Sequence, residues 1–103
     1  VTAGTFTKNL VKAAPVLWDK KVTDAGVAQA VVINTGIANA CTGQAGYENA
    51  AETAKLAGEA LNISSDTVLV ASTGVIGFTL PMDVRQQSVE RQSHLEQCAK
   101  VPV

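Results

Sequence analysis

Two short runs of β-branched and aliphatic residues each lead directly into a loop of glycine and small polar residues. Residues 31–33 lead into residues 34–43, and residues 68–71 lead into residues 72–77. A buried strand that ends in glycines and hydroxyl side chains brings backbone N–H groups and small donors to one edge of a sheet, where α/β proteins commonly bind ligands. Such loops stabilise negative charge on a phosphate, a carboxylate or an acyl-transfer oxyanion. Donors alone do not identify an enzyme.

The segment between the two runs has the pattern of an amphipathic helix over residues 44–61. Its apolar residues recur at steps of three and four, which places them on one stripe. They are Tyr47, Ala50, Ala51, Ala54, Ala57 and Leu61. A stripe made mostly of alanine lets a helix lie close against a sheet, and Asn62 marks the helix end.

Further elements complete the expected order. Alternation predicts a strand at residues 3–9, and Pro15 opens a short helix over residues 15–22. Buried strands are expected at residues 27–34 and 67–71, and a helix with a thin apolar stripe at residues 82–100. Strand, helix and strand in this order indicate an α/β layer arrangement.

Composition limits the size of the core and the kinds of partner. The 103 residues suffice for one domain, and 47% are hydrophobic, but alanine supplies much of this share. Small side chains bury little area, so we expect the chain to need a partner. The net charge of −1 and the dispersed lysines and arginines argue against nucleic-acid binding. No apolar run approaches the ~20 residues of a membrane span. An intracellular location is the default.

Four motifs in order carry a family resemblance. They are residues 11–18, residues 34–43, residues 71–77 and residues 80–83. Together they closely resemble the N-terminal (α) part of the ornithine acetyltransferases, the glutamate N-acetyltransferases of arginine biosynthesis. Several motifs in the right order are more specific than one glycine signature. The resemblance covers residues 1–83, whereas residues 84–103 form a tail that we cannot place in the family.

The resemblance implies an incomplete layered sandwich of sheets and helices. Family members are precursors that cut themselves before a threonine, which then serves as the nucleophile, and this residue lies downstream of the present chain. The implied reaction moves an acetyl group from N-acetylornithine to glutamate. Acetyl-CoA is a further donor in some members, and neither a cofactor nor a metal is implied. The implied partners are the downstream β chain and further subunits in a homo- or hetero-oligomer. The cytoplasm is the expected location, or the mitochondrial matrix for a fungal protein.

Thr73 and Gly74 are the catalytic candidates. A hydroxyl and a backbone N–H at about 2.7–3.1 Å from a developing oxyanion stabilise it where water is excluded. The matching Thr-Gly pair of the family forms this oxyanion hole. The alternative interpretation is a polar turn that merely ends a strand.

The loop of residues 34–43 has two interpretations. Its amides either support neighbouring backbone or line the substrate pocket, and structural support is favoured. A phosphate loop is excluded because neither loop ends in Gly-Lys followed by Ser or Thr.

The remaining reactive residues favour structural or solvated roles. A catalytic His94 needs a nucleophile and an orienting carboxylate, which Ser93 and Glu96 cannot supply through sequence adjacency alone, so a solvated surface histidine is favoured. Lys8 and Lys12 are expected to be solvated rather than to face an anionic substrate. Trp18 is expected in the core. Cys41 and Cys98 lack metal or redox spacing and are expected as buried or half-buried thiols.

Two functional classes stay open. The first is a segment of an acetyltransferase that supplies the oxyanion hole. The second is a non-catalytic structural or assembly fragment, either cut from a longer chain or naturally short, that lacks the nucleophilic threonine. The oxyanion loop would look the same in both.

Overall fold

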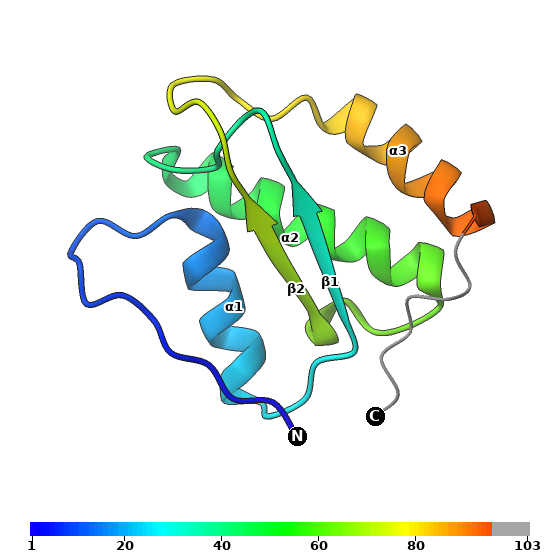
Figure 1. Ribbon diagram of the computed structural model, residues 1–103, viewed down its shortest axis with the longest axis horizontal. Helices are drawn as coiled ribbons and strands as arrows, with labels where there is room; N and C mark the ends of the chain where they lie inside the picture. Colours follow the sequence, from blue (N-terminus) through cyan, green and yellow to red (C-terminus); the bar gives the residue numbers. More distant parts are fainter. Residues whose placement is uncertain (96–103) are drawn as a thin grey trace.

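A computed structural model describes residues 1–95, and for residues 89–95 it describes the backbone alone. The elements in chain order are α1 (Ala14–Asp24), β1 (Ala30–Asn34), α2 (Gly43–Leu61), the 3₁₀ helix η1 (Ser65–Thr67), β2 (Val68–Ser72) and α3 (Met82–Leu95). Figure 1 shows α2 behind the strand pair, α1 beside β2, and α3 on the side of β1.

The two strands form a parallel pair. Their register runs from Ala30 opposite Val68 to Asn34 opposite Ser72. Parallel strands need a crossover connection, and α2 supplies it. Helices and a parallel sheet in this order confirm the predicted α/β arrangement.

Helix α2 buries the predicted alanine stripe. Ala50 and Ala54 are fully buried and Ala57 nearly so, and they pack with Val68 and Val70 of β2 in the core. The helix ends where Asn62 adopts the left-handed conformation at φ 58°. Because alanine side chains are short, the helix backbone lies close to the sheet.

Two side chains of α1 cover the outer edge of β2. The Trp18 Nε1 donates a hydrogen bond to the Val68 carbonyl at 2.8 Å, and the Val70 N–H donates to Asp19 Oδ1 at 2.8 Å. Backbone groups on an exposed strand edge invite pairing with another strand. Here α1 takes the place of that strand, and Trp18 is also the buried core residue that was expected.

The predicted strand at residues 3–9 is wrong. This segment contains no strand and most of its residues are exposed. Near it, the Thr2 N–H donates to the Gly26 carbonyl at 2.8 Å, and the Ala28 N–H donates to Thr2 Oγ1 at 3.0 Å. Alternation alone does not make a strand when no neighbouring strand receives its backbone bonds.

The other boundaries move by a few residues. β1 begins at Ala30 rather than at residue 27, because residues 65–67 are coiled into η1 and the partner strand starts only at Val68. Helix α1 extends the predicted helix at both ends, and α3 begins directly after Pro81. The expected helix over residues 96–100 lies outside the described residues, as does Cys98. The domain boundary at residue 83 stays a prediction.

Candidate functional site

The loops that follow β1 and β2 run side by side. The Thr73 N–H donates to the Asn34 carbonyl and the Val75 N–H to the Gly36 carbonyl, each at 3.1 Å. The Ala38 N–H donates back to the Val75 carbonyl at 3.0 Å. Both loops leave the carboxyl ends of parallel strands in matched register, so these bonds join them into one structure. We call residues 34–38 and 72–75 the loop crossing.

Two glycines let the two loops of the crossing approach each other closely. Gly36 and Gly74 have φ angles of +105° and +135°, which L side chains rarely adopt. A Cβ atom on residue 74 would lie 2.3 Å from the carbonyl carbon and oxygen of Gly36. Residue 74 must therefore be glycine if the two backbones are to approach this closely.

Thr73 and Gly74 lie at the surface of the crossing, and each has a different hydrogen-bond donor left without a partner. The Thr73 N–H is already bonded to Asn34, so its hydroxyl is the group left for a ligand. Within residues 1–95, neither the Thr73 hydroxyl nor the Gly74 N–H makes a hydrogen bond. Both residues are exposed. Thr73 and Gly74 thus carry a free hydroxyl and a free amide on adjacent residues.

Amide and hydroxyl side chains brace the crossing from within. The Asn34 Nδ2 donates to the Ile37 carbonyl at 3.0 Å, and the Ser72 hydroxyl donates to Asn34 Oδ1. Asn34 therefore ties the end of β1 to its own loop and to the end of β2. The Asn34 side chain therefore supports neighbouring backbone, which is the role that the sequence favours for the amides of this loop.

Asn39 anchors the far end of the first loop. It is 1% exposed, its Nδ2 donates to the Gly46 carbonyl at 2.7 Å, and its Oδ1 accepts from the Thr42 hydroxyl at 2.6 Å. The Asn39 carbonyl also accepts the Ala14 N–H at 3.1 Å. These bonds join the loop to α1 and α2. The amides of Asn34 and Asn39 are thus occupied within the chain.

Exposed apolar side chains flank Thr73 and Gly74. Val75, Ile76 and Phe78 are 58%, 59% and 63% exposed. Oxyanion stabilisation is strong where water is excluded. In the described residues the two donors face solvent, and an apolar rim next to them is available for further protein to cover.

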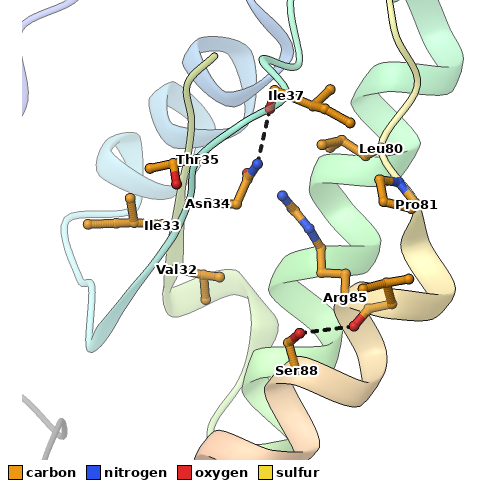
Figure 2. A pocket seen from close by; sticks show the side chains of 10 residues that line it. Val32, Ile33, Asn34, Thr35, Ile37, Leu80, Pro81, Arg85 and Ser88 are labelled. Carbon is orange, nitrogen blue, oxygen red and sulfur yellow. Dashed lines mark hydrogen bonds between the residues drawn. The ribbon is translucent and has the colours of Figure 1, made fainter. Parts of the chain in front are cut away.

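An open hollow of about 320 Å³ lies beside the crossing, between β1 and α3. Figure 2 shows Asn34, Thr35 and Ile37 on one side of it and Leu80, Pro81 and Arg85 on the other. Thr73 and Gly74 do not line it. Sequence patterns did not single out Arg85, because one arginine in a weakly amphipathic helix carries no distinctive signal.

The other predicted residues do not join the crossing. Lys12 and the exposed Cys41 line a second hollow of about 630 Å³ near the start of α2. The expected burial of Cys41 is therefore wrong, since its backbone lies at φ 56° in a surface turn. Lys8 is exposed as expected. His94 lies in the part of α3 for which the structure describes the backbone alone.

Two classes of feature are absent from the described part of the chain. Among the side chains of residues 1–88, which are the ones that the structure describes, no group of three or more His, Cys, Asp or Glu is placed to hold a metal ion. Within residues 1–95, no helix has the length and apolarity needed to span a membrane.

Sequence relatives match most of the chain. The family model described as the ArgJ family matches residues 1–101. The arginine biosynthesis bifunctional protein ArgJ of Streptomyces avermitilis is 53% identical over 89 residues, which are 86% of this chain and 23% of that protein. The corresponding protein of Symbiobacterium thermophilum is 59% identical over 81 residues, 79% of this chain and 20% of that protein. The chain spans about a fifth of the length of these relatives.

Solved structures agree with the sequence matches. Ornithine acetyltransferase of Mycobacterium tuberculosis, complexed with ornithine, superposes with a TM-score of 0.86 and 45% identity over 90% of this chain and 51% of that chain. The ArgJ protein of Bacillus halodurans gives a TM-score of 0.80 and 40% identity over 87% of this chain and 48% of that chain. Family model, sequence and structure agree, and the chain therefore belongs to the ArgJ family.

Proposed function

We propose that this chain is the N-terminal part of an acetyltransferase of arginine biosynthesis, in which Thr73 and Gly74 form the oxyanion hole. The supporting observation is the loop crossing, where a hydroxyl and an N–H on adjacent residues are left without partners in residues 1–95. Family membership gives the arginine-biosynthesis context. The reaction itself follows from the resemblance described above.

The proposed reaction has two acyl-transfer steps. A threonine hydroxyl of the downstream segment attacks the acetyl carbonyl of N-acetylornithine, and the carbonyl oxygen becomes an oxyanion. Collapse of this intermediate breaks the C–N bond, and ornithine leaves with its amine protonated. The glutamate amine then attacks the acetyl-threonine ester and releases the threonine. An oxyanion forms in both steps, so the same two donors serve both.

The crossing explains why the donors are positioned before the reaction begins. Thr73 is held by the bond from its N–H to Asn34, and Gly74 is held against Gly36. Donors that are already oriented need no reorganisation as charge develops, which is the main source of their catalytic effect. Autocatalytic cleavage, pairing with a downstream β chain and a cytoplasmic location belong to the same proposal. Acetyl-CoA as a second donor is a further part of it.

The test is Thr73→Ala in the full-length protein. We expect kcat to fall on the order of 10²–10³ with little change in KM, because the hydroxyl binds charge that exists only in the transition state. Thr79→Ala is the matched control, since Thr79 is an exposed threonine on the same loop. A loss confined to substrate binding, with kcat preserved, would make Thr73 a ground-state contact. Full activity in both variants would favour the alternative in which Thr73 belongs to a polar turn that merely ends a strand.

A further inference from the structure

The hollow between β1 and α3 contains a cation that no acidic group of the described chain neutralises. Arg85 extends from the first turns of α3 into this space, toward the end of β1 (Figure 2). Among the side chains that the structure describes, those of residues 1–88, its guanidinium makes no ion pair. A half-buried guanidinium remains charged in proteins, so an anion is the chemically matching neighbour.

One hydrogen bond orients the guanidinium. The Arg85 Nη1 donates to the Thr53 hydroxyl oxygen at 2.7 Å, and that hydroxyl donates its own hydrogen to the Asn49 carbonyl at 2.7 Å. Thr53 is fully buried in α2. The Thr53 oxygen can therefore only accept from Arg85, and most of the five guanidinium donors remain available to a ligand.

The surroundings of Arg85 partly desolvate its charge and form a small, mainly apolar hollow. Burial lowers the pKa of Arg85 from its ordinary value, because the charged form is partly desolvated. The walls of the hollow are mainly apolar and include Val32, Ile37, Leu80 and Val84. Its volume of about 320 Å³ is that of a small ligand site.

We propose that this hollow binds a carboxylate through the guanidinium of Arg85, with the apolar body of the ligand against Val32, Ile37, Leu80 and Val84. A guanidinium matches the two oxygens of a carboxylate with two parallel hydrogen bonds. Arg85 is the one cationic residue among those that line the hollow, which suits a monoanion better than a doubly charged phosphate. The site is separate from Thr73 and Gly74, and the proposal does not depend on acetyl transfer.

A carboxylate reaches Arg85 from one of two sources. It is either a free small molecule or an Asp or Glu side chain of the protein beyond this chain. The full-length protein distinguishes them by calorimetric titration with butyrate, a four-carbon monoanion, and with butyramide, its neutral counterpart. A crystal structure of the full-length protein in butyrate shows which group contacts Arg85.

Butyrate binding that butyramide does not reproduce supports a free carboxylate ligand. Arg85→Gln should then weaken butyrate binding about tenfold or more, because the charge-assisted bonds are lost. Arg85→Lys should weaken it less, and Lys55→Gln, on the exposed face of α2, should leave it unchanged. The butyrate carboxylate should contact Arg85 in the crystal.

An Asp or Glu oxygen within 4 Å of the guanidinium, with no butyrate binding, supports the second source. The proposal is overturned if butyrate and butyramide bind equally or not at all and the crystal structure shows no carboxylate on Arg85. These outcomes are read from the wild-type protein, so they remain decisive even if Arg85→Gln does not fold.

Discussion

The outer edge of β2 and the loop at its carboxyl end differ in whether their hydrogen-bonding groups have partners. Along the outer edge, Trp18 and Asp19 bond to the backbone of Val68 and Val70 and leave it covered. At the carboxyl end, Thr73 and Gly74 present a free hydroxyl and N–H to solvent within the described residues. We call the outer edge of β2, where α1 occupies the backbone groups, the sealed edge. We call its carboxyl end, with Thr73 and Gly74, the open end. The comparison shows that one short strand both holds α1 in place and leads into unpaired hydrogen-bond donors.

The largest expected effect concerns the open end in isolation. Residues 1–103 alone should show no acetyl transfer from N-acetylornithine to glutamate, because donors without a nucleophile cannot carry the covalent route. The assay compares the purified chain with the full-length protein at equal concentration. Turnover by the chain alone, unaffected by the downstream part, would mean that the open end is already a complete active site.

The sealed edge should respond most strongly to loss of Trp18. Trp18→Ala removes a buried ring and its bond to the Val68 carbonyl, and we expect about 3–5 kcal/mol less stability. Trp18→Phe keeps most of the ring but leaves that carbonyl unpaired, at a cost of about 1–3 kcal/mol. Urea unfolding of the full-length protein measures both. Leu17→Ala is the control because Leu17 lies on the exposed side of α1. Equal effects for Leu17→Ala and Trp18→Ala would show that α1 does not seal the edge.

The open end should respond to any side chain at position 74. Gly74→Ala forces the crossing apart, and we expect kcat to fall on the order of 10² with a stability loss of about 1–3 kcal/mol. Gly77→Ala is a matched control, since Gly77 also has a positive φ, +112°, but its Cβ would meet nothing within 4 Å. If both variants lose the same activity, backbone strain rather than the contact with Gly36 is responsible.

The smallest expected effect is a pH dependence at Asp19. Burial raises the pKa of Asp19 above its ordinary 3.8, and the bond from the Val70 N–H only partly opposes this. The folded state therefore holds the proton more tightly, and this contribution to stability is lost as pH rises through the folded pKa.

Asp19→Asn removes the ionised group, so the variant should be slightly more stable than the wild type at pH 7. The difference should shrink as the pH falls toward 4. Thermal unfolding across this range measures it, with the exposed Asp24→Asn as control. A variant that is less stable at pH 7 would show that the hydrogen bond outweighs desolvation.

Local patterns predicted most of the fold. The alanine stripe from Ala50 to Ala57 placed α2, because burial of one face follows directly from residue spacing, and two β-branched runs placed β1 and β2. The burial expected for β1 was wrong on one face, where Val31 and Ile33 are 55% and 68% exposed, because α2 covers only the other face of the strand pair. The same reasoning failed at residues 3–9, where no partner strand is present. Thr53 was also missed, although a threonine three residues after Ala50 interrupts an apolar stripe and is itself a signal.

The sequence by itself determined where strands end in glycine and hydroxyl residues, and which motifs mark the family. Only the tertiary structure decided that Gly36 meets Gly74, that the Thr73 N–H is bonded to Asn34, and that Arg85 reaches Thr53. Secondary structure depends on neighbours a few residues apart. These contacts join residues more than thirty positions apart, and they depend on strand register and helix packing, which no local pattern contains.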